Sequence, residues 1–287
     1  MKSYRSVWFG AFLATGAAVA VIGGNIENRD AFAGQPAVQA EPTVASLATQ
    51  QDGFKWGMTH AEVIKIHNQV NGIFDRDYNP ILAKMQPGVR MDAVEKERDA
   101  LKTAFQNNFL QFKDTPTGYD TTALRGEYSY RNKESVQLVT RAGKRRFFFY
   151  IGDTPGERLW KIYDEVKLVD GGPLGKSFAE ANQKLTVQVG APGAVRGADE
   201  AKGFPLPYLG WQDAASHLRL IDRSGEGIAA VVVEDKQVLS ALPQLRSAKS
   251  EDLFAMDPAL AAATRGGLSD PNARVDAGAP APTKKKK

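Results

Sequence analysis

The chain of 287 residues contains no cysteine and only three histidines. Without cysteine it can form no disulfide, so a folded domain must be stabilised by burial alone. Attachment to a membrane through a lipidated cysteine is excluded for the same reason. With so few histidines, the usual constellations of nucleophiles and metal ligands are scarce as well.

A large excess of charge of one sign is also missing. The net charge is +4, and the terminal run Lys284–Lys287 supplies four of the positive charges. A broad basic surface that would attract nucleic acid is therefore not expected. With 43% hydrophobic and 24% charged residues, the composition is typical of a globular protein with one or two domains.

One long apolar run is present, at the amino terminus. It covers residues 6–24, is rich in alanine and glycine, and follows a segment that carries Lys2 and Arg5. This pattern predicts a signal peptide over residues 1–33, cleaved after Ala33. An uncleaved inner-membrane anchor is the alternative, because about 20 apolar residues can span a bilayer. Both interpretations leave Lys2 and Arg5 inside and predict a periplasmic or secreted body.

Segments poor in large apolar residues flank the body. Residues 34–52 are small, polar and proline-bearing, which predicts a flexible linker. Residues 249–287 are predicted to form a mostly disordered tail, because they offer little apolar surface to bury. The four lysines that end the tail either solubilise it or attract anionic envelope polymers and lipid head groups. The folded body is expected to cover about residues 53–248.

The first part of the body, residues 53–169, is expected to place three helices before any strand. A capping box of Thr59 and Glu62 predicts the start of the first helix. The second is predicted to end at Pro87, and the third to run from Met91 to Phe112, where apolar residues recur at near-helical spacing. After that the apolar period falls to two, which predicts a four-stranded antiparallel meander. Its strands are expected at residues 123–131, 135–141, 144–152 and 158–168.

The second part, residues 170–248, follows the same order in a shorter form. Ser177 and Glu180 form another capping box, and the predicted helix ends at Gly190. Three strands are expected after it, at residues 208–214, 217–223 and 227–235. Each part also has a tryptophan late in its order, Trp160 or Trp211. We therefore expect an α+β fold made of two related units, each with a helix or helices followed by an antiparallel sheet.

The second unit resembles the BamE (SmpA/OmlA) domain of outer-membrane assembly lipoproteins. The positions that carry the resemblance are Gly175, Ser177, Glu180, Gly190, Pro192 and Trp211. The first unit matches only at Gly57, Thr59 and Glu62; its helical insertion over residues 74–112 departs from the family, as does the missing lipidated cysteine. The first unit otherwise resembles exported bacterial proteins of unknown role. The BamE resemblance implies a periplasmic, non-enzymatic module that binds other envelope proteins.

The residues with metal-binding chemistry form no complete motif. His60 and His67 lie seven residues apart on one predicted helix, a rise of about 10.5 Å, which is too far to hold one metal ion. An exposed helix face explains these two histidines better. The segment from Asp75 begins like a calcium loop but has Pro80 and Gln86 where glycine and glutamate are required. No metal and no cofactor is therefore expected.

An aromatic and basic cluster in the first predicted sheet is the candidate binding site. Alternation along the strands places part of this cluster away from the expected core. The candidate residues are Arg146, Phe148, Tyr150, Lys161 and Tyr163. Aromatic rings beside Arg and Lys suit protein or glycan partners. The alternative is that a helix or the second unit packs over this face, because both faces of a central strand are often buried.

The sequence thus predicts an exported, non-enzymatic binding or scaffolding protein of the bacterial cell envelope. Its expected partner is an envelope protein or an anionic cell-wall polymer, and no catalytic residue is predicted. The alternative is a periplasmic hydrolase, if folding brings Glu127, Asp164 and Glu165 together with His217. Nothing in the spacing of these residues predicts that meeting. Paired carboxylates in one deep cleft would favour the hydrolase.

Overall fold

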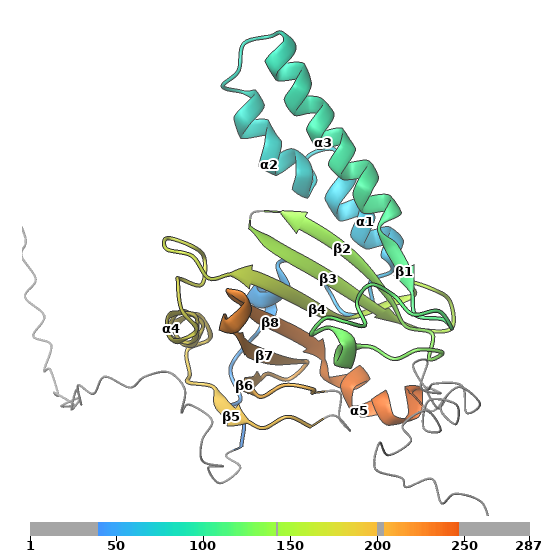
Figure 1. Ribbon diagram of the computed structural model, residues 1–287, viewed down its shortest axis with the longest axis vertical. Coiled ribbons are helices and arrows are strands. Elements are labelled where there is room, and N and C mark those ends of the chain that lie inside the picture. Colours follow the sequence, from blue (N-terminus) through green and yellow to red (C-terminus); the bar gives the residue numbers. More distant parts are fainter. Residues whose placement is uncertain (1–39, 142, 200–203, 247–287) are drawn as a thin grey trace, which may run out of the picture. The chain divides into compact units, whose positions relative to one another are not determined.

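All the strands named in the described part of the chain belong to one antiparallel sheet, in the order β1-β2-β3-β4-β8-β7-β6-β5 (Figure 1). The computed structural model describes residues 40–141, 143–199 and 204–246. The predicted signal segment and the lysine tail lie outside these residues. The strands are β1 (Phe109–Gln111), β2 (Ser135–Arg141), β3 (Lys144–Ile151), β4 (Arg158–Lys167), β5 (Ala194–Arg196), β6 (Tyr208–Gln212), β7 (Ser216–Arg223) and β8 (Ile228–Asp235).

The α+β class is confirmed, but the sheet is larger than a four-stranded meander. β4 and β8 pair along their length, with Ile162 opposite Val233 and Asp164 opposite Val231. The strands of residues 53–169, which we call the first half, and those of residues 170–246, the second half, therefore share one sheet. Chain order alone does not predict this central pairing, because it joins strands far apart in the sequence.

The helices of the described residues are α1 (His60–Asn68), α2 (Ile73–Leu82), α3 (Val89–Asn107), α4 (Phe178–Val189) and α5 (Lys236–Leu245). Two of them, α1 and α4, start where the capping boxes predict. The hydroxyl of Thr59 accepts from the Glu62 N–H at 3.3 Å, and that of Ser177 accepts from the Glu180 N–H at 3.2 Å. Gly190 ends α4 in the left-handed conformation, φ 84°, which glycine adopts without strain. α5 is not predicted; Asp235 at the end of β8 caps it by accepting from the N–H of residue 237.

The prediction of a strand over residues 123–131 is wrong. This segment contains a short 3-10 helix, η2 (Arg125–Glu127), and Arg131 has left-handed backbone with φ 62°, which interrupts extended pairing. The rings of Tyr128 and Tyr130 are buried against the sheet face instead. β2 pairs with β3 on one side and with β1 on the other, and the helical spacing assigns β1 to the end of the third helix.

Residues 40–52, which we call the strap, do not form the predicted flexible linker. Thr43 makes a parallel bridge to Gln212 at the end of β6, and Leu47 is fully buried in the core of the second half. The N–H of Leu47 donates to Asp213 at 2.6 Å. Leu47 and the partly buried Val44 therefore fix this mostly polar stretch against the sheet, and a short 3-10 helix, η1 (Ala48–Gln51), follows. Residues 34–39 lie outside the described residues.

Helices cover one face of the sheet in both halves. In the first half, α1, α2 and α3 pack on a cluster that includes Phe148 and Ile162; in the second half, α4 packs on a cluster that includes Trp211 and Leu218. The opposite face is covered by segment 112–130 and by α5. Trp160 lies on β4 in the core of that opposite face, whereas Trp211 lies on β6. The two tryptophans are therefore not equivalent, contrary to the expectation from their order.

Candidate functional site

The five residues of the predicted binding surface are buried, and they lie on two faces. None has more than 4% of its surface exposed. Arg146, Phe148 and Tyr150 face the helices, but Lys161 and Tyr163 face the other way, because they pair across the strands with Phe149 and Phe147. These residues therefore do not form one exposed surface. Both faces of these strands are covered by other segments, as the alternative interpretation of this cluster predicts.

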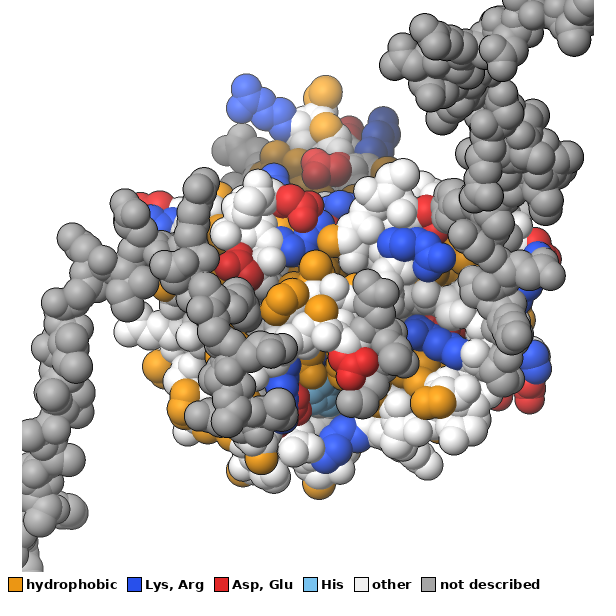
Figure 2. All heavy atoms as spheres, turned by 60° about the horizontal axis from the view of Figure 1, so that its bottom comes forward, with side chains coloured by type: hydrophobic (Ala, Val, Ile, Leu, Met, Phe, Trp, Pro, Cys, Tyr) orange, Lys and Arg blue, Asp and Glu red, His pale blue; other side chains and the backbone are white. Residues whose placement is uncertain are grey.

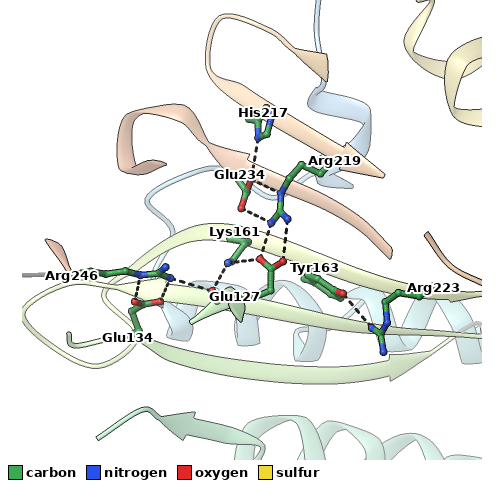
Figure 3. A network of polar contacts seen from close by, with 9 residues as sticks. All are labelled: Glu127, Glu134, Lys161, Tyr163, His217, Arg219, Arg223, Glu234 and Arg246. Atoms are coloured by element: carbon green, nitrogen blue, oxygen red, sulfur yellow. Dashed lines mark hydrogen bonds and ion pairs between the residues drawn. The ribbon is translucent and has the colours of Figure 1, made fainter. Parts of the chain in front are cut away.

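A buried network of charges occupies the face that carries Lys161 (Figure 3). At its centre Arg219 of β7 is fully buried and lies between two carboxylates. Its guanidinium donates to both oxygens of Glu127, at 3.1 and 2.7 Å. It also donates to both oxygens of Glu234, at 3.0 and 2.8 Å. Glu127 comes from the first half, whereas Arg219 and Glu234 come from the second, so the network joins the halves across the β4–β8 seam.

Further ion pairs extend the network at both ends. Lys161 lies 3.0 Å from Glu127 and donates to its backbone carbonyl as well. Beyond it, Arg246 at the end of α5 donates to both oxygens of a buried carboxylate, that of Glu134. At the other end His217 lies between Glu234, at 3.1 Å, and Glu41 of the strap, at 3.0 Å. The strap is therefore connected electrostatically to the seam.

Ionised groups dominate the electrostatics of this network. Burial alone raises the pKa of a carboxyl group, but the charge of Arg219 outweighs burial and holds the pKa of both Glu127 and Glu234 below the usual range. Burial likewise lowers the pKa of a histidine, yet its two carboxylate neighbours raise the pKa of His217. Burial lowers the pKa of Lys161, against the attraction of Glu127. A carboxylate held ionised in this way is a poor general acid.

The four residues of the hydrolase alternative are not brought together. Glu127 and His217 belong to the same network, but Arg219 and Glu234 separate them. Asp164 lies on the helix-covered face. Glu165 lies toward the end of β4, where it pairs with arginine side chains, those of Arg145 and Arg223. The described residues therefore contain no cleft that joins these four groups.

A cleft of about 630 Å³ opens on the helix-covered face, above the central strands. Its floor is apolar and comes from β4 and β8: Ile162, Val166, Val231 and Val233. One side is formed by the strap, through residues 49–52, and the other by α4 and the turn before it, through Leu174, Leu185 and Gln188. The cleft therefore lies over the seam, where all three parts of the body meet.

One end of the cleft is polar. Arg146 donates to both oxygens of Asp164 at 2.7 Å, and its remaining nitrogen lies 2.9 Å from Asp52 of the strap. Lys144 also reaches Asp164, at 3.1 Å. Burial raises the pKa of Asp164, but these cations outweigh it and lower the pKa below its usual value. Arg141 is the third cation that lines the cleft, and it donates to both oxygens of Asp77 at 2.7 Å, so the charges at this end are balanced. An apolar floor beside an end of balanced ion pairs suits a ligand with an apolar body and a polar group.

His67 is the clearest error among the predicted roles. The expected exposed face would leave it in water, but its side chain is 1% exposed. Its ring lies 4.3 Å from the ring of Phe105 and 5.4 Å from that of Phe54, measured between centroids. Its Nδ1 is 2.9 Å from the backbone oxygen of Val63, which identifies this nitrogen as the donor. Burial lowers the pKa of His67 to about 4. Because His67 is neutral at pH 7, it is a core residue and carries no charge to a partner.

Charged side chains of both signs stand among hydrophobic ones on the face that Figure 2 shows. In the part of the chain that the structure describes, no group of three or more acidic or histidine side chains is arranged to hold a metal ion. In the same residues, no helix is both long enough and apolar enough to cross a membrane.

Comparisons of the chain with protein-family models, with curated proteins and with solved structures gave no match.

Proposed function

We propose that the chain is an exported, non-enzymatic binding or scaffolding protein of the bacterial cell envelope, and that the cleft over β4 and β8 receives its partner. The cleft itself carries this proposal: its apolar floor lies beside ionised side chains that are all held in ion pairs. Such a surface offers burial and charge complementarity, and it holds no group poised to exchange a proton. A partner segment with an apolar body and a polar group would match it.

Two related units, fused through their last strands, would account for the architecture. Within each half the strands follow one another as a meander, and the last strands meet at the centre. Each half also begins its first helix after a glycine with nearly the same left-handed backbone, φ 82° at Gly57 and 84° at Gly175. These parallels support a duplication. The resemblance of the second half to the BamE domain stays a prediction, and with it the implied binding of envelope proteins.

Site-specific photo-crosslinking in the producing cell tests the cleft. A photoreactive residue replaces Gln188, which lines the cleft, or Gln183, which is exposed on the same helix but does not line it. We expect a crosslinked partner from the first position and not from the second. Equal crosslinking from both positions, or none from the cleft, would contradict the proposal.

Export has a separate test. Residues 1–52 fused to a reporter that is active only outside the cytoplasm should give activity, and the mature protein should begin near Gly34. An intact Met1 in the membrane fraction would select the anchor instead. Reporter activity confined to the cytoplasm would contradict the proposed localisation, whatever the cleft binds.

A further inference from the structure

The β1 edge of the sheet has backbone groups that point away from the molecule's own strands. The ladder between β1 and β2 joins Leu138 to Asn108 and Phe112 to Glu134, so the hydrogen-bonded positions of β1 are even-numbered. In an antiparallel pair the intervening residues direct their N–H and C=O groups outward. Those residues are Phe109 and Gln111. The carbonyl of Gln111 accepts from the N–H of residue 113, which leaves two N–H groups and one carbonyl on this edge for an incoming strand.

Its length of three residues is the one usual protection of an edge strand that β1 has. Edges are commonly blunted by lysine, proline or a bulge, or are covered by another segment. The sequence Phe109–Gln111 has no charge and no proline, and its residues are only partly buried. The opposite edge differs. There β5 carries Arg196, which is paired with Glu41 of the strap at 3.1 Å. Of the two edge strands, only β1 consists of uncharged residues that are all partly exposed.

A groove of about 720 Å³ runs beside this edge. It is lined by β1 itself, by Asn107 and Asn108 before it, and by Lys113 and residues 115–119 after it. Its apolar part includes Phe109, Pro116 and Tyr119, and the single charge in its lining is that of Lys113. The backbone edge and the groove together have the two features of strand-addition sites: main-chain partners for affinity, and an adjoining pocket for side chains.

We propose that the β1 edge binds an extended peptide segment of a partner protein, which adds to the sheet as a strand. Alternate side chains of the segment enter the groove, and an acidic residue of the segment lies beside Lys113. This site is separate from the cleft over β4 and β8, so it does not depend on the function proposed for that cleft.

The test uses the full-length exported protein and a phage-displayed library of random linear peptides as the probe. We expect selected peptides that alternate apolar with other residues and carry an acidic one. In the unaltered protein, binding of such a peptide should slow hydrogen exchange at the amides of Phe109 and Gln111. Gln111→Pro removes an outward N–H without removing a ladder bond, and edge strands tolerate proline. It should weaken binding roughly tenfold, through the lost hydrogen bond and the clash of the ring.

Gln111→Ala is the matched control, because it shortens the same side chain and keeps the N–H; its affinity should stay within about twofold of the unaltered protein. Lys113→Glu should weaken binding several-fold, more strongly at low salt. Equal affinity of Gln111→Pro and the unaltered protein would overturn the proposal, and so would protection of other amides or the recovery of no peptide. The amides of Phe109 and Gln111 could instead be protected in the free protein and lose this protection when residues 249–287 are deleted. That result would assign the edge to the chain's own tail and would also overturn the proposal.

Discussion

Two buried histidines, one in each half, have opposite chemistry. His67 on α1 lies among the rings of Phe54, Phe74, Phe105 and Phe148, and burial lowers its pKa to about 4. His217 on β7 is nearly as well buried, yet the carboxylates on either side raise its pKa. Burial therefore does not decide the charge of a side chain in this protein. The partners do, and they differ because the first half packs aromatic rings under its helices whereas the seam of the sheet packs ion pairs.

The two histidines make stability depend on pH in opposite senses. The folded pKa of His67 lies below the unfolded value of 6.5, so its contribution is complete above pH 6.5 and is lost as the pH falls toward 4. The folded pKa of His217 lies above that value, so its contribution is complete below pH 6.5 and is lost as the pH rises through the folded pKa. Together they favour maximum stability near neutral pH.

The largest loss of stability should come from replacing Arg219, the centre of the buried ion-pair network that includes His217. Arg219→Met leaves Glu127 and Glu234 buried without their shared cation, and removal of one partner of a buried ion pair costs about 3–5 kcal/mol. Urea unfolding at pH 7 should show a loss of that size. The control is Lys133→Met, which removes an exposed pair to Asp153 and should cost less than about 1 kcal/mol. Similar losses in the two variants would show that the network does not hold the halves together.

The contribution of His67 in its aromatic cluster is tested by measuring stability at low pH. His67→Phe keeps a ring in the cluster and removes the titration, so its stability should fall less steeply between pH 6.5 and 4 than that of the unaltered protein. The difference should reach about 3 kcal/mol, because one pKa unit corresponds to about 1.4 kcal/mol. Urea midpoints of both proteins across this range give the measurement, and taking their difference removes the contribution of the shared carboxylates. Parallel pH profiles would mean that His67 titrates normally in the folded protein.

The two histidines also show which features of the structure the sequence patterns predict and which they do not. The capping boxes at Thr59 and Ser177 predict helix starts correctly, because each is a local arrangement of hydroxyl and backbone. Periodicity predicts β2, β3 and β4 to within about a residue, since their side chains alternate. Neither signal reports which distant segments meet. A polar helix position such as His67 has the same pattern whether water or four phenylalanines of other segments surround it.

The errors in the candidate site have the same physical origin. Only the pairing register of β3 and β4 shows that Lys161 and Arg146 lie on opposite faces of the sheet. The sequence does not give that register, in which Trp160 is an extra residue without a partner on β3. The buried network requires the pairing of β4 with β8, which closes a loop of some 60 residues and leaves no local trace. The strap shows the limit most simply, because Leu47 and Val44 fix a segment whose composition predicts a linker.

A smaller effect is expected from the polar histidine. His217→Gln keeps a hydrogen-bonding side chain but removes the positive charge between Glu41 and Glu234, and hydrogen bonds to charged groups contribute about 1.5–3 kcal/mol. The loss of stability should therefore be greatest near pH 5 and should shrink as the pH rises through the folded pKa of His217. Glu41→Gln should lower that pKa, which an NMR titration of the ring measures directly. An unchanged pKa in this variant would mean that the strap does not contact His217 in solution.

The smallest effects compare the two helix caps. Thr59→Ala and Ser177→Ala each remove a hydroxyl that accepts from the first turn of a helix, so each should cost about 1 kcal/mol. The pairing of β4 with β8 makes one cooperative sheet, so either substitution should lower the single unfolding midpoint by a similar amount and leave the slope of the urea transition unchanged. Thr103→Ala, on the exposed face of α3, is the control and should change stability by less than about 0.5 kcal/mol. If instead Thr59→Ala separated the transition into two steps while Ser177→Ala did not, the first half would unfold on its own. The seam with its buried ion pairs would then be an interface between two independently stable parts.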